Sequence, residues 1–450
     1  MTKITSITYV KNGAAYIERC VRSVAKQSLR EIEIIVVDGG STDGTLTVLE
    51  RLYREDPRIK ILTSEGSVGA QFNMAFKMAT GEYIAVCEGD DYIFPDKYEA
   101  QYKIAKRYDL DVLRACYYRF FECGGKEYRY KVETGPSKER YDQLIETEGG
   151  DQFLALGING FWNGIYRREF LVSHNIYMNE TKGAAYQDIS FSFLCQLYAK
   201  RIWFMSDAYH CYRIDNPEAS SNDSKCIDMH IEEYELLRKR LIKNDLWERC
   251  QRMFLLWELG SYQYFINECS GADRLKEVRK ICQALLVQHS RDNSKKDRLP
   301  EGTMDLLQAL FYDKNRFCAL MLDQAGQNDR TIQYFENQGV NEKTMILFGA
   351  GHFGDIIYDF LKLSHKEIIV VDNSLKLQSE GYKNQKVHHP DFIGSFNKDY
   401  PIIIASTVCA GEMYKQLKVL GVEDRRIVIC DNEELFLRKI FVRLNCRYGC

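Results

Sequence analysis

The sequence predicts an α/β protein that begins with a parallel sheet flanked by helices and ends with a second, smaller α/β domain. Short β-rich runs alternate with helical patterns over the first hundred residues and again from residue 344. The stretch between them is charged and carries long helical patterns. We therefore expect domains at 1–215, 216–342 and 343–432, followed by an apolar, basic tail at 433–450.

The elements of the first domain follow from alternating runs and their boundaries. Strands are predicted at 4–10, 32–38, 58–63 and 83–87, with helices between them. Ser41 or Asp43 is placed to cap the second helix, and Gly81 to close the third, at 69–79. Ligands of open α/β sheets bind beyond the carboxyl ends of the strands, so the residues that follow strands two and four should face one site.

Acidic residues gather at those strand ends. Asp38 ends the second strand, and Glu88, Asp90 and Asp91 follow the fourth. Two carboxylates about 4 Å apart repel by about 4 kcal/mol at an effective dielectric near 20, so such a cluster requires open water or a cation. A solvated turn is the alternative, but the position beside Asp38 favours a ligand site.

The first strand-to-helix turn, VKNGAAY, has a single glycine and cannot form a glycine-rich phosphate cradle. If this sheet binds a nucleoside diphosphate, a divalent metal held by the acidic cluster would balance its charge. A metal bridging two phosphates is a Lewis acid for a leaving diphosphate. The pattern therefore indicates transfer of a group from an activated donor with Mn²⁺ or Mg²⁺.

The stretch from Ile4 to about Asn222 resembles the family-2 glycosyltransferases. The matching segments occur in the family's order and are SITYVKNGAAYIERCVRSVAKQS, IEIIVVDGGSTDGT, MATGEYIAVCEGDDYIFPDKY, NGFWNGIYRREFL, AYQDISFSFL and YHCYRIDNPEASSND. The resemblance implies a GT-A fold, a divalent metal, and transfer of a sugar with inversion from a nucleotide-sugar donor.

The resemblance also implies roles for the acidic residues. Asp38 matches the aspartate that contacts the nucleotide base, and Asp91 matches the metal ligand. Asp90 matches the residue that holds the donor ribose or a metal-bound water. Glu88 stands where many members carry aspartate, and we include it with Asp90 and Asp91 in the predicted metal set.

Catalysis and the acceptor side are assigned in the same way. Asp188 matches the general base that deprotonates the acceptor hydroxyl, with Gln187 before it where many members have glutamate. Arg213 is placed to pair with the donor diphosphate, because a guanidinium suits that geometry. Trp162 and Asn163 are expected on the acceptor side.

The C-terminal α/β domain carries GAGHFG between a predicted strand and a helix. Gly349, Gly351 and Gly354, with Asp372 after the next strand, form a dinucleotide fingerprint and a candidate second nucleotide site, with NAD as one ligand. Alternatively, the glycines serve only strand-helix packing. An NAD-dependent oxidoreductase or a sugar-nucleotide-sensing protein is therefore the alternative function. A sugar nucleotidyltransferase or a non-catalytic transferase scaffold accounts less well for the whole set of motifs.

Composition limits the partners and the compartment. The 61 Lys and Arg balance 64 Asp and Glu, which gives no sign of nucleic-acid binding. The resemblance to family-2 glycosyltransferases implies a UDP-sugar donor, since UDP is common in that family, and a glycan or lipid-linked acceptor in cell-surface polysaccharide synthesis. The fifteen scattered cysteines, the absence of a signal pattern and the lack of a long apolar run favour the cytoplasm. The tail, LFLRKIFVRLNCRYGC, predicts either peripheral contact with an anionic membrane or a solvated terminal helix.

Overall fold

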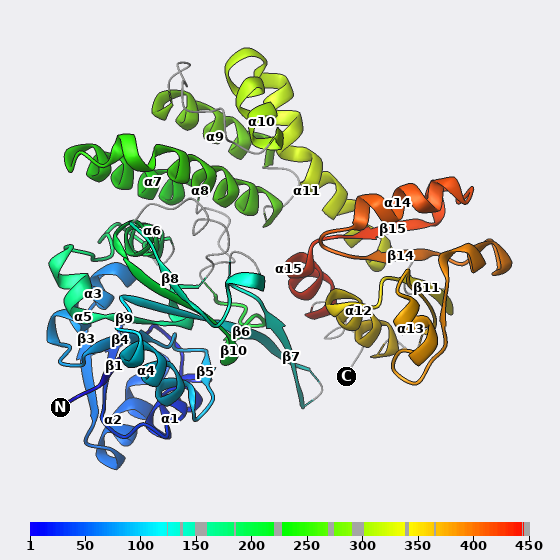
Figure 1. Ribbon diagram of the computed structural model, residues 1–450. Helices are drawn as coiled ribbons and strands as arrows, with labels where there is room; N and C mark the ends of the chain where they lie inside the picture. The colour runs from blue at the N-terminus through cyan, green and yellow to red at the C-terminus, as the bar shows by residue number, and fades with distance from the viewer. Residues whose placement is uncertain are drawn as a thin grey trace. The chain divides into compact units, whose positions relative to one another are not determined.

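The computed structural model describes residues 1–123, 125–135, 138–148, 160–183, 186–219, 227–268, 274–289, 301–337, 342–363, 366–442 and 444 (Figure 1). The chain forms two compact units. The N-terminal unit comprises 1–120, 129–262 and 280–312, and the C-terminal unit comprises 121–128, 263–279 and 313–450. Helices of the predicted middle region, 216–342, are thus divided between the two units.

The first four strands are parallel, as the alternating pattern predicts. They are β1 (Ile4–Val10), β2 (Ile32–Asp38), β3 (Ile59–Thr63) and β4 (Tyr83–Val86). Every residue of β1, β2 and β4 is buried, as expected for strands covered on both faces. In register, Ile4 lies opposite Ile32 and Val10 opposite Asp38, so Asp38 stands at the carboxyl edge of the sheet.

The connecting helices are α1 (Ile17–Ala25), α2 (Thr45–Glu55) and α3 (Val68–Met78). Two predicted caps are wrong. The residue before α2 is Gly44, and it forms no side-chain cap bond; Asp43 instead accepts hydrogen bonds from the backbone and side chain of Thr45. Helix α3 ends at Ala79, whose extended backbone stops the helix two residues before Gly81.

The sheet continues beyond β4 to ten strands in the order β3-β2-β1-β4-β9-β6-β10-β5, with β7 paired to β6 and β8 to β10. Strand β9 is antiparallel to both of its neighbours. The added elements are β5 (Tyr92–Ile93), α4 (Lys97–Arg107), β6 (Val112–Cys123), β7 (Lys126–Val132), β8 (Leu144–Glu146), β9 (Ile165–Arg167), α5 (Arg168–Ser173), α6 (Asp188–Tyr198) and β10 (Arg201–Arg213). The mixed α/β class predicted from the sequence is confirmed.

The middle region is helical, as its pattern predicts. It contains α7 (Ile227–Lys243), α8 (Trp247–Glu268), α9 (Arg274–Gln288), α10 (Glu301–Tyr312) and α11 (Lys314–Asn337). Helix α7 packs against α6 in the N-terminal unit (Figure 1). The sequence of residues 289–302, HSRDNSKKDRLPEG, predicts an exposed loop between helices, and this stretch lies largely outside the described residues.

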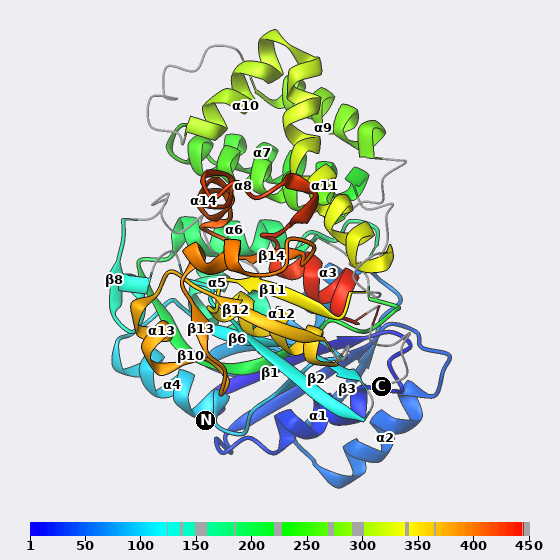
Figure 2. The same cartoon turned by 90° about the vertical axis from the view of Figure 1, so that its right-hand side faces the viewer.

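The C-terminal unit contains a five-stranded parallel sheet in the order β13-β12-β11-β14-β15 (Figure 2). This is the strand order of a doubly wound sheet, in which successive strands are added first on one side of β11 and then on its other side. Its elements are β11 (Thr344–Phe348), α12 (His352–Leu363), β12 (Glu367–Val371), α13 (Leu375–Glu380), β13 (Val387–His388), β14 (Ile402–Ala405), α14 (Ala410–Val419) and β15 (Ile427–Cys430). The separate small α/β domain predicted after residue 343 is therefore present.

The start of the tail is packed into the C-terminal unit. It forms α15 (Glu433–Leu435) and a π-helical turn, η7 (Phe436–Val442), whose buried residues include Phe436 and Phe441. Phe436 contacts Phe335 and Phe360 with ring centroids 5.4 and 5.3 Å apart. The described part of the tail therefore buries apolar side chains within the C-terminal unit, and peripheral membrane contact of the tail stays a prediction. Among the helices that the structure describes, none has the length and apolar character to cross a bilayer.

Candidate functional site

A cleft of about 660 Å³ lies at the carboxyl edge of the N-terminal sheet. Its walls come from the end of β1 and the turn after it, the start of α3, the turn after β4, the end of β10 and the start of α7. The residues whose side chains or backbone carry the argument below are Tyr9, Gly39, Gln71, Glu88, Asp90, Gly183, Tyr212, Asn216 and Met229. The sequence argument that residues after strands two and four share one site is thus matched by this geometry.

Glu88 and Asp90 line the cleft together. The Tyr9 hydroxyl donates to Glu88 Oε1 over 2.6 Å, and Asn216 Nδ2 donates to Asp90 Oδ2 over 2.7 Å. Burial, followed by the charges of Asp90 and Asp188, raises the pKa of Glu88 well above its ordinary range. Burial also raises the pKa of Asp90. A divalent cation between these two carboxylates would relieve both effects.

Asp91 has different partners from those that the sequence prediction assumed. It is 1% exposed and is absent from the cleft lining. His210 Nε2 lies 2.8 Å from Asp91 Oδ2, and the Arg213 backbone amide donates to Oδ1 over 2.9 Å. Both oxygens are therefore engaged within the protein. These contacts favour Asp90 and Glu88 over Asp91 as metal ligands.

Asp38 is placed at the end of β2, as predicted, and is 2% exposed. Its Oδ2 accepts hydrogen bonds from the backbone amides of Gly40 and Ser41, both over 3.1 Å. Its Oδ1 is buried and has no hydrogen-bond partner among the described residues. A buried carboxylate oxygen without a donor is costly, so this atom is suited to accept a hydrogen bond from a ligand.

Asp188 begins α6 and does not itself line the cleft. Its charge contributes to the raised pKa of Glu88, so the two carboxylates lie within electrostatic range. Burial raises the pKa of Asp188 as well. The side-chain amide of Gln187 donates to the carbonyls of Thr181 and Gly183, each over 3.3 Å, which a glutamate at this position could not do while ionised.

Three other predicted residues, Arg213, Trp162 and Asn163, are buried and do not line the cleft, contrary to the donor and acceptor contacts expected of them. Arg213 is 6% exposed; its guanidinium lies between the rings of Tyr16 and Phe120 and pairs with Asp215. Trp162 is buried and stacks on Tyr212, a residue of the cleft, with ring centroids 4.8 Å apart. Asn163 is fully buried, and its side-chain oxygen accepts from Arg114 Nε.

A family model described as Glycosyl transferase family 2 matches residues 5–172, which include Asp38, Glu88, Asp90 and Asp91. Residues 5–172 therefore form a glycosyl transferase family 2 domain. The resemblance inferred from the ordered motifs is therefore confirmed, and the chain is a glycosyltransferase.

Individual relatives agree with this assignment. Glycosyltransferase GlyG of Streptococcus pneumoniae is 26% identical over 216 residues, which are 47% of this chain and 70% of that protein. Chondroitin synthase of Pasteurella multocida is 37% identical over 108 residues, 24% of this chain and 11% of that protein. Other bacterial relatives are matched over 60–63% of their length.

A solved structure with the same fold is that of S. aureus TarS in complex with UDP-GlcNAc. It superposes with a TM-score of 0.56 at 22% identity and covers 72% of this chain and 92% of that one. At this identity the similarity establishes the GT-A fold of the glycosyltransferase. A second family model, described as C2185-like, N-terminal, matches residues 341–428 in the C-terminal unit.

Four acidic residues line the glycosyltransferase cleft, Glu65, Glu88, Asp90 and Glu218, and of these Glu88 and Asp90 lie together in the turn after β4. Among the residues that the structure describes, no group of three or more His, Cys, Asp or Glu side chains is arranged to hold a metal ion. Mg²⁺ and similar ions are commonly held by one or two carboxylates together with substrate phosphates. Glu88 and Asp90 fit that mode of binding.

The fingerprint of the C-terminal unit is placed at the turn between β11 and α12. Gly349 has φ +109°, and a Cβ on Gly354 would lie 2.1 Å from the Gly349 carbonyl oxygen, so both glycines are required by the turn itself. A Cβ on Gly351 would meet nothing within 4 Å. Both Asp372 oxygens accept backbone hydrogen bonds, from Ala350 and Ser374. The predicted second nucleotide site remains a prediction.

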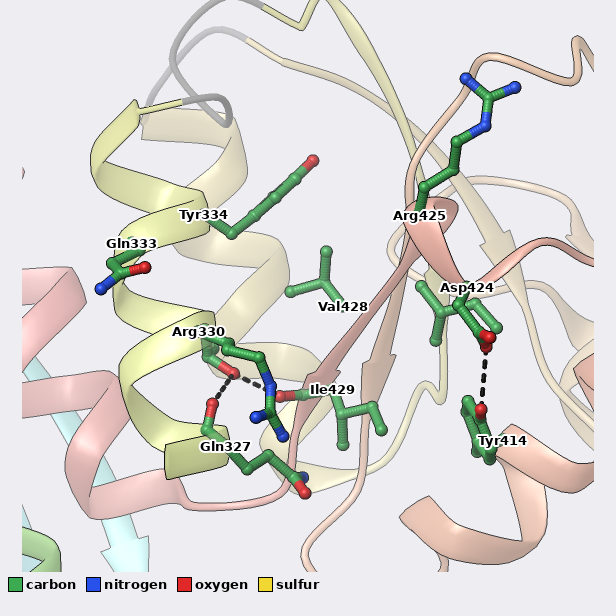
Figure 3. A pocket seen from close by; sticks show the side chains of 11 residues that line it. Gln327, Arg330, Gln333, Tyr334, Tyr414, Asp424, Arg425, Val428 and Ile429 are labelled. Atoms are coloured by element: carbon green, nitrogen blue, oxygen red, sulfur yellow. Dashed lines mark hydrogen bonds between the residues drawn. The ribbon is translucent and has the colours of Figure 1, made fainter. Parts of the chain in front are cut away.

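A second cavity, of about 570 Å³, lies in the C-terminal unit between α11, α14 and the edge strand β15 (Figure 3). Thr331 on α11 donates to the Ile429 carbonyl over 2.7 Å, and Tyr414 on α14 donates to Asp424 over 2.8 Å. None of the residues predicted to act in the glycosyltransferase reaction lines it. It contains no side chain with an evident chemical role in sugar transfer.

Several residues of the cleft were missed by sequence reasoning. Tyr9 lies within the buried strand β1, where it reads as a core aromatic, and Gln71 lies within α3. Asn216 lies three residues after Arg213, in a segment that resembles the family. That position was the only sequence feature that could have suggested a role for it in the site. Met229 lies on α7, far along the chain, and only the tertiary structure brings it to the cleft.

Proposed function

We propose that the protein transfers a sugar, with inversion, from a UDP-sugar to a hydroxyl of a glycan or lipid-linked acceptor in polysaccharide synthesis. The observation that carries the proposal is the geometry of one cleft. Glu88 and Asp90 line this cleft, Asp38 ends β2 at the same edge of the sheet, and Asp188 lies within electrostatic range of Glu88.

The donor is assigned to the side of the cleft formed by β1, β2 and α3. Asp38 Oδ1 is a buried acceptor without a partner in the described chain and suits an N–H group of a nucleotide base. The choice of a uridine nucleotide is supported by the UDP-GlcNAc bound in the TarS structure. The choice of a polysaccharide product is supported by the similarity to chondroitin synthase.

Glu88 and Asp90 would hold Mn²⁺ or Mg²⁺ together with the donor diphosphate. When bound, such an ion supplies Lewis-acid stabilisation of the charge that develops on the leaving diphosphate. Tyr9 and Asn216 orient the two carboxylates by donating to one oxygen of each. Asp91 is not part of this set, because its two oxygens are engaged by His210 and by the Arg213 backbone amide.

Asp188 would act as the general base. Inversion requires one carboxylate to take the proton of the acceptor hydroxyl while that hydroxyl attacks the sugar carbon from the face opposite the leaving group. Burial raises the pKa of Asp188, which increases its basicity toward the operating pH. The cleft wall formed by Gly183 and Met229 is then the acceptor side.

The compartment is part of the same proposal. The described cysteines are all free thiols, most of them buried, as expected in a reducing environment. We therefore propose that the enzyme acts in the cytoplasm on a glycan or a lipid-linked precursor.

The proposal is tested by incubating the protein with UDP-glucose, UDP-galactose, UDP-GlcNAc or UDP-GalNAc, with Mn²⁺ or with EDTA, and measuring release of UDP. We expect Mn²⁺-dependent release from one of these donors. Asp188→Asn should lower release at least about 100-fold, within the range that a general base contributes, while leaving the UDP dissociation constant within about twofold.

Two results would overturn the proposal. One is the absence of any UDP binding in isothermal titration with Mn²⁺ present. The other is full activity of the Asp188→Asn protein. Activity that persists unchanged in EDTA would remove the metal from the proposal and leave the transfer itself intact.

A further inference from the structure

Helix α7 lies beyond the residues matched by the family model, yet it holds the segment that carries Asp188. Its Glu233 is fully buried. The Glu233 carboxylate accepts from Asn179 Nδ2 over 2.7 Å, from Thr181 Oγ1 over 2.6 Å and from Ser190 Oγ over 3.3 Å. All three donors come from residues 179–190, the segment that leads into and begins α6.

The same segment is fixed from its other side by α3, a helix of the donor wall. Asn73 Nδ2 donates to the Met178 carbonyl over 2.9 Å, and the Met178 amide donates back to Asn73 Oδ1 over 3.1 Å. A Cβ on Gly69 would lie 1.9 Å from the Asn179 carbonyl oxygen, so glycine allows the two backbones to touch. The segment is therefore held between α3 and α7.

The contacts of α7 with this region come from one face of the helix. Met229 lines the cleft, His230 stacks on Tyr186 with ring centroids 4.0 Å apart and planes 9° apart, and Glu233 binds the segment. Residues separated by three or four positions lie on one face of a helix, so a single helical face supplies all three contacts.

A buried carboxylate is costly unless its oxygens receive hydrogen bonds. Glu233 receives those described above from one short segment, so its burial is stable only while that segment keeps its conformation. Conversely, the polar side chains of Asn179, Thr181 and Ser190 all donate to this one carboxylate on α7, and Asn179 also donates to Ser190 Oγ over 3.0 Å. This mutual dependence fixes the entry into α6, and Asp188 lies two residues from Ser190.

We propose that Glu233 is a positioning residue for the glycosyl-transfer reaction. It holds residues 178–183 and 186–190 so that Asp188 and the acceptor side of the cleft are formed before substrate arrives. The inference rests on the proposed function for the role of Asp188, and it assigns α7 to the catalytic domain rather than to a separate helical domain.

The experiment compares Glu233→Met, which keeps the side-chain length and removes every acceptor, with Glu232→Met at the exposed neighbouring position. UDP release from the donor identified above is measured with Mn²⁺, and the UDP dissociation constant is measured separately. We expect kcat to fall at least about tenfold for Glu233→Met, because misplacement of a catalytic group by about 1 Å can cost about 100-fold. UDP affinity and the kcat of Glu232→Met should change by less than about twofold.

Hydrogen-deuterium exchange separates this inference from the proposed function. Amides in peptides covering 178–183 should exchange at least about tenfold faster in Glu233→Met than in the wild type or in Glu232→Met. Glu233→Gln keeps one acceptor oxygen and should give an intermediate increase in exchange. It also provides the test if the Glu233→Met protein does not fold. Unchanged exchange in this peptide, or a kcat for a folded Glu233→Met protein equal to wild type, overturns the inference. If the wild type shows no UDP binding, the proposed function fails, while the exchange result still decides whether Glu233 holds the segment.

Discussion

His210 Nε2 lies 2.8 Å from Asp91 Oδ2, and neither side chain has any solvent exposure. On the other side of the ring, Lys97 Nζ lies 2.8 Å from His210 Nδ1 and donates to the Trp162 carbonyl over 3.0 Å. Burial, with a further effect from Lys97, lowers the pKa of His210 well below its usual value, so the ring is neutral. A neutral ring that donates from Nε2 and accepts at Nδ1 joins the Asp91 carboxylate to the Lys97 ammonium.

This network predicts that Asp91→Asn mainly lowers stability, whereas Asp90→Asn mainly lowers ligand binding. Asp91→Asn places an NH₂ group or a single oxygen where the carboxylate accepts from His210 and from the Arg213 amide, and should lower the free energy of unfolding by about 1–3 kcal/mol. Asp90→Asn changes a residue of the cleft and should cost less than about 1 kcal/mol while abolishing Mn²⁺-dependent UDP binding. Urea denaturation followed by tryptophan fluorescence suits the test, because all four tryptophans lie in the N-terminal unit.

A stable Asp91→Asn protein that has lost Mn²⁺-dependent binding would show that Asp91 is the metal ligand after all. Asp96→Asn, at the start of α4 next to the buried Lys97 but outside the network, provides the control for the loss of one negative charge in this part of the chain. Its stability and UDP affinity should remain close to those of the wild type.

The sequence predicted the first domain well because its signals are local. Four all-apolar or nearly apolar runs with helical patterns between them define a parallel sheet, and the carboxyl-end rule then brings Asp38 and the acidic cluster together. The errors at α2 and α3 also have a local cause. Gly44 adopts a left-handed conformation and Ala79 an extended one, and backbone choices of this kind compete closely with side-chain caps over one or two residues.

The sequence could not predict that Asp90 lines the cleft while Asp91 is buried beside it. Asp90 and Asp91 are adjacent, and their roles depend on which side of the turn each faces. That is decided by His210 and Asn216, residues more than a hundred positions away. Glu233 shows the same limit, since its helix reads as a charged amphipathic helix and only the folded chain shows that one of its acids is buried against the segment carrying Asp188.

Asp38→Asn should weaken donor binding while leaving the fold intact. The amide is isosteric with the carboxylate and can keep one oxygen toward the amides of Gly40 and Ser41, but it then presents an NH₂ group where the Oδ1 acceptor was. Loss of a hydrogen bond to a buried charged acceptor costs about 1.5–3 kcal/mol, so the UDP dissociation constant should rise about 10- to 100-fold. Isothermal titration with Mn²⁺ measures it. An unchanged UDP affinity would show that the nucleotide base binds elsewhere and does not contact Asp38.

The glycines of the C-terminal unit give a paired prediction. Gly354→Ala should destabilise that unit by about 1–3 kcal/mol, because its Cβ would enter the Gly349 carbonyl, whereas Gly351→Ala should fold normally. Scanning calorimetry measures the stability of the two variants. If the turn also binds a dinucleotide, Gly351→Ala should abolish the fluorescence enhancement of added NADH without a loss of stability. No enhancement with the wild-type protein would assign the glycines to packing alone.

His230 predicts acid sensitivity of the N-terminal unit. Burial lowers its pKa from 6.5 to about 3, so between these values the unfolded chain binds a proton that the folded chain does not. Stability from the neutral ring is fully present above pH 6.5 and is lost as the pH falls toward 3, at about 1.4 kcal/mol per unit. His230→Phe keeps a ring against Tyr186 and removes the titrating group, so its melting temperature should fall less steeply over this range than that of the wild type. His174→Phe retains His230 and should follow the wild-type profile. Parallel profiles for all three proteins would show that another group governs acid unfolding.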